Sequence, residues 1–174
     1  QQTTNKVDYD IILLAGNDSS LRSTRPYGAH KCARELRIHG FKTLVVNHIY
    51  HFSESDLKDL LEKCVSKKTL FVGISNSYMP KFVTRLIETV KPCLPSGCKL
   101  VMGGAFTEVD TFYENIDYTV LGFADLSIVN LAKHLRDGEQ LRRATKNIFG
   151  SIQIDDPVAE GFNISTSKME WHPD

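Results

Sequence analysis

The sequence predicts a three-layer α/β/α fold, in which helices cover both faces of a doubly wound, five-stranded parallel sheet and a short C-terminal extension follows. Five short apolar runs alternate with five helical patterns over the first 140 residues. Several of these runs end on glycine and have no alternating polar residues, which is typical of central parallel strands buried on both faces. Strict alternation of strand and helix favours parallel connections around one sheet.

Five segments are predicted as strands because each is short, apolar and followed by turn-forming residues. In chain order they are 9–16, 42–49, 69–75, 98–104 and 117–122. The segment 144–156, "ATKNIFGSIQIDD", follows the last helical pattern, and we expect one or two further short strands in it.

Five segments with apolar residues at helical spacing are predicted as helices, namely 28–41, 53–68, 79–94, 107–116 and 125–139. Gly40 and Gly138 are natural C-terminal stops for the first and last of them. Ser53 or Ser55 is the expected N-cap of the second helix. Pro80 falls in the first turn of the third helix, where proline is tolerated.

The length of 174 residues suits one compact domain. Hydrophobic residues make up 41% and charged residues 24%, a balance that is ordinary for a globular protein. We therefore expect an N-terminal tail over 1–8, one Rossmann-like domain over 9–150, and a linker or extension over 151–174. The end at "EWHPD" has no helix cap, which suggests that the chain comes from a longer protein.

Charge and cysteine content exclude several classes of protein. The 21 basic and 21 acidic residues cancel, so the basic excess expected of a nucleic-acid-binding domain is absent. No apolar run approaches the roughly 20 residues that cross a bilayer. Four cysteines fit neither a CxxC pattern nor an evident disulfide framework, so we expect reduced thiols and a cytoplasmic protein.

The predicted sheet places a ligand site at the carboxyl ends of its strands, where ligands of open α/β sheets bind. Four loops meet there, with the sequences "AGNDSS", "GISNSYMP", "GGAF" and "LGFADLS". Their glycines allow close backbone approach, and their short polar side chains offer hydrogen bonds. Glycine and serine after a strand are also ordinary turn chemistry, so each loop alone has two interpretations.

The sequence contains none of the common catalytic or nucleotide-binding motifs. The chain has no GxGxxG dinucleotide fingerprint, no P-loop, no HExxH and no GxSxG elbow. His48 and His51 are spaced i, i+3 and would bind a metal only with further ligands. His30 begins a helix at the ligand edge and is expected to be a surface group. No set of nucleophile, base and orienting partner can be assembled.

Several segments, in this order, resemble the cobalamin-binding domain of B12-dependent radical SAM enzymes. The strand end "VGIS" (72–75), the strand end "MGG" (102–104) and the segment "DYTVLG" (117–122) are similar to motifs of that family. Upstream, "RPYGAHKCARELRIHGFKTLVVN" is similar to the family's first helix and second strand. The resemblance covers about residues 8 to 150, and the tail is similar to the linker that leads into a radical SAM barrel.

Two differences from related patterns limit what the resemblance implies. The family's "GEGE" is "GFAD" here, so that only Asp125 keeps a carboxylate. The loop after the first strand has no DxHxxG motif, and no histidine occurs before His30. The resemblance therefore implies cobalamin bound base-off, without an imidazole from that loop. The chain also lacks CxxxCxxC, so the [4Fe-4S] cluster and S-adenosylmethionine would be bound by a radical SAM domain, in cis or in trans.

In the family the nucleotide tail of cobalamin threads between the sheet and a helix, and the corrin lies across the strand ends. The resemblance and the position at the sheet edge together imply a set of cofactor-binding residues. They are Asn17, Asp18, Ser19, Ser75, Asn76, Ser77, Gly103, Gly104, Ala105, Gly122, Phe123 and Asp125.

The expected function is therefore that of a cobalamin-binding module of a methyltransferase-like radical SAM enzyme, with no catalysis by this chain alone. Two other interpretations stay open at this point. One is a flavodoxin-like regulatory or interaction domain without a cofactor. The other is a small nucleotide-using transferase, which would need a carboxylate or histidine with a perturbed pKa in a pocket at the strand ends.

Overall fold

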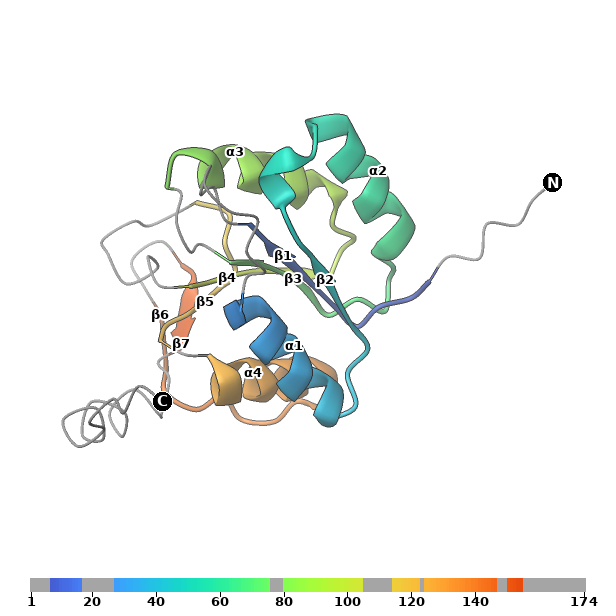
Figure 1. Cartoon of the computed structure of the whole chain (residues 1–174). Coiled ribbons are helices and arrows are strands. Elements are labelled where there is room, and N and C mark those ends of the chain that lie inside the picture. The colour runs from blue at the N-terminus through green and yellow to red at the C-terminus, as the bar shows by residue number, and fades with distance from the viewer. Residues whose placement is uncertain are drawn as a thin grey trace, which may run out of the picture.

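A computed structural model describes residues 7–16, 27–75, 80–104, 114–122, 124–146 and 150–154. The described residues form three layers, with a sheet between two pairs of helices (Figure 1). The strands are β1 (Ile11–Ala15), β2 (Thr43–Val46), β3 (Phe71–Ser75), β4 (Lys99–Gly103), β5 (Tyr118–Val120), β6 (Ala144–Lys146) and β7 (Ile152–Ile154).

The strand order is β2-β1-β3-β4-β5-β7-β6. All neighbouring strands are parallel except β6 and β7. The chain runs from β1 outward to β2 and then returns to β3 on the other side of β1. The order therefore reverses between β1 and β3, and the carboxyl ends of these two strands mark the switch point where doubly wound folds bind ligands.

The helices are α1 (Tyr27–Ile38), α2 (Glu54–Cys64), α3 (Pro80–Val90) and α4 (Asp125–Asp137), with short 3-10 helices η1 (Ile49–His51) and η2 (Lys91–Cys93). Their ends follow the expected signals. The Ser53 hydroxyl accepts a hydrogen bond from the Asp56 amide at 3.1 Å and caps α2. Gly40 and Gly138 have positive φ angles of 85° and 75° after the ends of α1 and α4.

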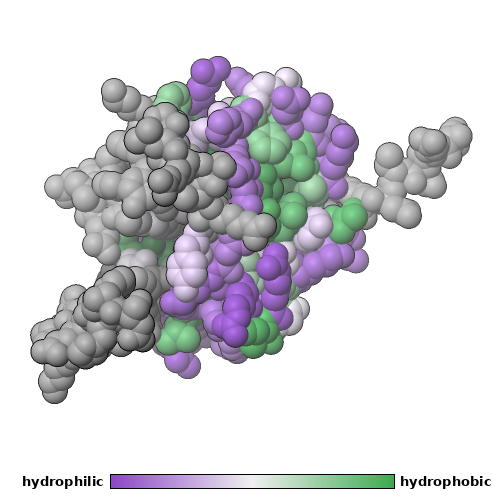
Figure 2. Space-filling model, viewed as in Figure 1, coloured by the Kyte–Doolittle hydropathy of each residue, from purple (hydrophilic) through white to green (hydrophobic). Residues whose placement is uncertain are grey.

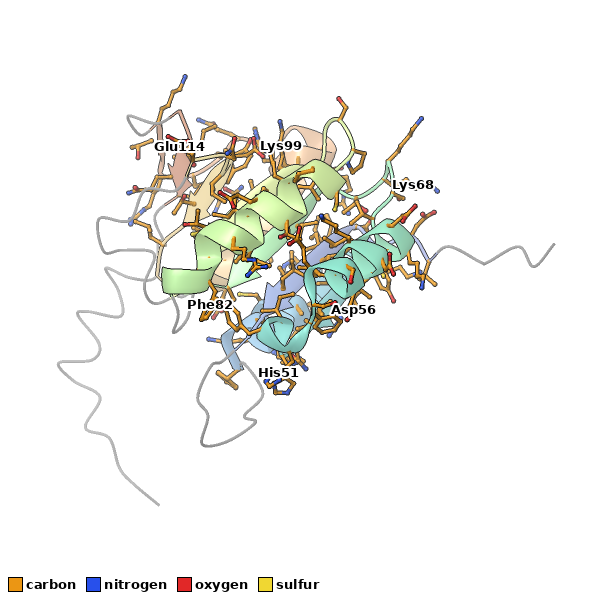
Figure 3. All side chains as sticks on the ribbon, turned by 90° about the horizontal axis from the view of Figure 1, so that it is seen from above. His51, Asp56, Lys68, Phe82, Lys99 and Glu114 are labelled. Atoms are coloured by element: carbon orange, nitrogen blue, oxygen red, sulfur yellow. The ribbon has the colours of Figure 1, made fainter. Side chains whose placement is uncertain are left out.

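The two sheet faces carry separate cores because successive strand residues point to opposite sides. Helices α1 and α4 cover one face, and α2 and α3 cover the other (Figure 1). Hydrophobic residues are visible between the helical layers, and hydrophilic residues cover the outer sides of the helices (Figure 2). From the α2 and α3 side, Phe82 and His51 lie toward one edge and Lys68 toward the other (Figure 3).

The fold class is confirmed, with a difference in the number of strands. The described residues contain seven strands instead of five, because both halves of the segment 144–156 join the sheet. β7 lies within the range 151–174, where the sequence predicts an extension. The expected helix over 107–116 lies largely outside the described residues, and Glu114 and Asn115 near its end form a turn. None of the four cysteines forms a disulfide in the structure.

Asp117, the first residue of the "DYTVLG" segment, joins the amino end of β5 to β4. Its carboxylate accepts hydrogen bonds from the Leu100 amide at 2.8 Å and the Lys91 ammonium at 2.9 Å. The Asp117 amide in turn donates to the Leu100 carbonyl. Asp117 therefore connects the starts of β4 and β5 by hydrogen bonds, at the end of the sheet opposite the strands' carboxyl ends.

Cys98 immediately precedes β4, and its ionisation tests how well this region near Asp117 is buried. Burial raises the pKa of its thiol to about 11, and the nearby Asp117 carboxylate adds to the shift. Because the thiol ionises near 9.0 when unfolded, its contribution to stability is complete below pH 9 and is lost as the pH rises through 11. Between these values the free energy of unfolding should fall by about 2 kcal/mol more in wild type than in Cys98→Ala, measured by urea unfolding. An equal fall in both proteins would contradict the burial of the thiol.

Candidate functional site

Side chains on the sheet face under α1 and α4 become small toward the carboxyl ends of the strands. Along β1 the residues on this face are Ile11, Leu13 and Ala15, and along β3 they are Phe71, Gly73 and Ser75. On β4, Val101 is followed by Gly103. The opposite face shows no such change, since Ile12, Leu14, Val72, Ile74, Leu100 and Met102 all belong to its core.

A cavity of about 400 Å³ lies where this face becomes bare. Its floor comes from the central strands, with Leu13, Gly73, Ser75, Val101, Gly103 and Val120 among the lining residues. The strand register places Leu13, Gly73 and Val101 in one row and Ala15, Ser75 and Gly103 in the next. The cavity therefore extends at least one row inward from the carboxyl edge, on both sides of β3.

The first turns of two helices form the roof. Helix α1 contributes Gly28, Ala29 and Cys32, and α4 contributes Ile128 together with Ala124, which immediately precedes the helix. Both helices begin near the carboxyl ends of the strands (Figure 1). The later part of α1 packs on the sheet through Ala33 and Leu36, both fully buried. The helix thus contacts the sheet at one end and spans bare backbone at the other.

The glycines of the cavity differ in their reasons for lacking a side chain. A Cβ built on Gly73 would lie 2.8 Å from Leu13 Cδ2, and one on Gly103 would lie 3.4 Å from the Val120 carbonyl oxygen. Gly104 and Gly122 have φ angles of 119° and 74°, which strongly favour glycine. A Cβ on Gly28 would meet no heavy atom within 4 Å. Neither packing nor backbone conformation therefore requires glycine at position 28.

An ion pair joins the two roof helices. The Lys31 ammonium on α1 contacts the Asp125 carboxylate on the first residue of α4. The hydrogen bond to Asp125 raises the pKa of Lys31, and the charge of Asp125 adds to the effect. Asp125 also carries its negative charge at the positive end of the α4 dipole, which favours that position. The pair links the starts of α1 and α4 at the surface.

The structure brings together four of the twelve predicted site residues. Ser75, Gly103, Gly104 and Gly122 all line the cavity. Asp125 lies beside it and is paired with Lys31. The other seven lie outside the described residues: Asn17, Asp18, Ser19, Asn76, Ser77, Ala105 and Phe123.

The other residues of the wall are not among the predicted site residues, although the sequence contains signals for some of them. Gly73 lies inside an apolar strand, two residues before Ser75, so both residues face the same side of the sheet. Ala29 and Cys32 fall at helical spacing, both are buried, and both line the cavity. The glycine after β1 has another role, because a Cβ on Gly16 would lie 2.6 Å from the Tyr50 ring. Gly16 makes room for this tyrosine.

The described part of the wall contains no carboxylate and no histidine. His30 lies at the start of α1, where its Nε2 is 3.0 Å from Asn47 Oδ1. The rings of His48 and His51 lie 5.8 Å apart, and His51 points outward at the rim (Figure 3). Among the described residues no group of three or more metal-ligating side chains exists. As far as its described wall goes, the cavity is suited to hold an uncharged apolar group and offers neither a carboxylate nor an imidazole.

No family model and no curated protein matches this chain. Solved structures are similar in fold. One is the radical S-adenosylmethionine methyltransferase TsrM from Kitasatospora setae with cobalamin and a [4Fe-4S] cluster bound, with a TM-score of 0.66 and 17% identity over 86% of this chain and 29% of that chain. Another TsrM structure, with tryptophan and a SAM analogue bound, gives a TM-score of 0.61 and 18% identity over 84% of this chain and 30% of the other.

The apo structure of OxsB, a cobalamin-dependent S-adenosylmethionine radical enzyme, gives a TM-score of 0.57 and 9% identity over 85% of this chain and 22% of OxsB. The chain therefore spans less than a third of the length of each of these enzymes. At these identities the comparison establishes a shared α/β fold. Within the helices that the structure describes, none is both long and apolar enough to cross a bilayer.

Replacing Gly28 by alanine tests whether this glycine serves the fold. Alanine is the better helix former and its Cβ meets open space, so the free energy of unfolding should rise by about 0.5 kcal/mol in urea denaturation. Gly104→Ala is the matched control in the cavity wall, and it should destabilise because the φ of 119° at this position strains any residue that has a Cβ. A loss of stability in Gly28→Ala would contradict the open geometry at this position.

Proposed function

We propose that this chain is a cobalamin-binding module, and that the cavity under α1 and α4 holds the nucleotide tail of the cofactor. The observation that carries this proposal is the loss of side chains toward the carboxyl edge on one sheet face alone. Side chains on the other face stay large to the ends of β1, β3 and β4. This cavity, which we call the slot, lies at the switch point of the sheet and suits a flat group that enters from the strand ends.

The size and chemistry of the cavity agree with such a group. A cavity of about 150 Å³ lined by apolar side chains binds benzene. The cavity of about 400 Å³ is large enough for a base of two fused rings and part of a ribose. Its described wall is apolar and uncharged, which matches dimethylbenzimidazole, the base at the end of the cobalamin tail.

The chain's residues would position the cofactor. Gly73 and Gly103 leave the floor bare for the base, and Ser75 carries the hydroxyl nearest the mouth. The amide groups at the starts of α1 and α4 are oriented to favour the phosphate of the tail. The corrin would then lie across the strand ends. When bound, cobalamin supplies a cobalt that can carry a methyl group.

This arrangement implies base-off binding, because a base within the slot is far from the corrin. The loop after β1 contains no histidine, so no imidazole from that loop would replace the base on cobalt. We further propose that the whole enzyme is a radical SAM methyltransferase. Its radical SAM domain would supply the [4Fe-4S] cluster and bind S-adenosylmethionine, since this chain has no CxxxCxxC motif.

Retention of the cofactor tests the proposal. The chain is mixed with hydroxocobalamin, desalted, and examined by visible absorption spectroscopy. We expect corrin absorbance to elute with the protein in a ratio near one to one. Absence of corrin absorbance at micromolar protein would contradict the proposal.

Gly28→Trp tests where the tail binds. Position 28 lies at the roof, and its Cβ has open space, so the bulky ring should fill the slot without disturbing the fold. We expect at least about a tenfold loss of affinity. Ile38→Trp, at the exposed far end of α1, is the matched control and should bind as wild type does. Gly104 is a poor choice for this test because its φ of 119° would strain any other residue.

Cys32 gives a measurement that does not depend on a variant. It is largely buried and lines the slot, whereas Cys64 and Cys93 pack against the core on the other face. Bound cobalamin should slow the alkylation of Cys32 by iodoacetamide severalfold and leave the other two unchanged, as followed by peptide mass spectrometry. Equal protection of all three thiols would indicate general stabilisation instead of occupation of the slot.

A further inference from the structure

We infer that the slot selects the base of the cofactor, favouring cobamides that carry a benzimidazole over those that carry a purine. This inference rests on the proposed function and adds a specificity to the same site. It follows from the chemistry of the wall and from where along the slot the polar groups lie.

The wall offers few hydrogen-bonding side chains. Among the described lining residues, the only side chains with a polar hydrogen are the Ser75 hydroxyl and the Cys32 thiol. A thiol is a weak donor and a weak acceptor. The other lining residues on this face carry no polar side-chain atom: Leu13, Gly28, Ala29, Gly73, Val101, Gly103, Gly104, Val120, Gly122, Ala124 and Ile128. Ile74 and Met102 also border the cavity, but their side chains belong to the core on the opposite face.

Ser75 carries the polar side chain of the cavity floor, and it lies near the opening of the cavity at the strand ends. Ser75 is the last residue of β3, in the row with Ala15 and Gly103. One row deeper are Leu13, Gly73 and Val101, which present only hydrocarbon or bare strand. Strand N–H and C=O groups at this row are paired within the parallel ladder. An edge of a base that reaches past Ser75 therefore meets hydrocarbon.

The two kinds of base differ along that edge. Dimethylbenzimidazole has two methyl groups on its six-membered ring and no polar atom there. Adenine has ring nitrogens that accept hydrogen bonds and an exocyclic amino group that donates them. Burying such groups without partners costs the hydrogen bonds they made with water. The methyl groups, by contrast, gain from leaving water.

Binding of three corrinoids to the wild-type chain tests the inference. They are cyanocobalamin, the cyano form of the adenine-containing cobamide, and dicyanocobinamide, which has no nucleotide. Dissociation constants are measured by equilibrium dialysis with corrin absorbance as the readout. We expect the adenine cobamide to bind at least about tenfold more weakly than cobalamin, because at least one buried polar group stays unpaired. Cobinamide should also bind more weakly than cobalamin, since it leaves the slot empty.

The outcomes separate this inference from the function beneath it. If none of the three corrinoids binds, the proposed function is wrong. If cobalamin and the adenine cobamide bind equally, the function stands and the selectivity is wrong. Equal binding of cobinamide and cobalamin would also overturn the inference, because the base would then contribute nothing.

A pair of isosteric variants locates the selectivity in the deeper row. Val101→Thr places a hydroxyl beside Gly73 on the cavity face. It should bring the dissociation constants of the adenine cobamide and cobalamin closer together. Val72→Thr places the same group on the other face of the sheet, in an equally buried position, and should leave the ratio unchanged. An unchanged ratio in Val101→Thr, or an equal change in Val72→Thr, would contradict the assignment.

Discussion

The absence of side chains on one part of one sheet face determines how the rest of this molecule is arranged. Protein interiors are packed at crystal-like density, so a helix normally settles onto the sheet beneath it. Here the far half of α1 does so through Ala33 and Leu36, while its first turn lies over Gly73 and its neighbours. A cavity of about 400 Å³ remains because neither surface carries side chains large enough to fill it.

Two further features keep this gap in place. The ion pair between Lys31 and Asp125 joins the two roof helices at their starts, next to the cavity. The fully packed face under α2 and α3 fixes the twist and register of the same strands from the other side. One face of the sheet is thus packed up to the carboxyl edge, and the other is packed except near that edge. The opening lies where the strand order reverses, so the fold and the candidate site follow from one topology.

The sequence predicts the elements well and some of the residues that line the cavity, for reasons that particular residues illustrate. Apolar runs, Gly40, Ser53 and Pro80 are local signals, and the elements they mark appear with ends shifted by a few residues. The short strands expected in 144–156 are present as β6 and β7, but the sequence carries no signal that they join the edge of the predicted five-stranded sheet. Gly103 was found because it ends a strand, whereas Gly73 was overlooked as part of a buried run. The roles of Cys32 and Gly28 depend on which strand faces which helix turn, and that is decided by tertiary packing.

The most direct test of the account is a crystal structure of this chain grown with hydroxocobalamin. The account predicts that the dimethylbenzimidazole base lies inside the cavity, in contact with Gly73 and Gly103, with the corrin outside the strand ends. A base that is bound elsewhere on the protein, or an empty cavity in crystals that contain the cofactor, would contradict it.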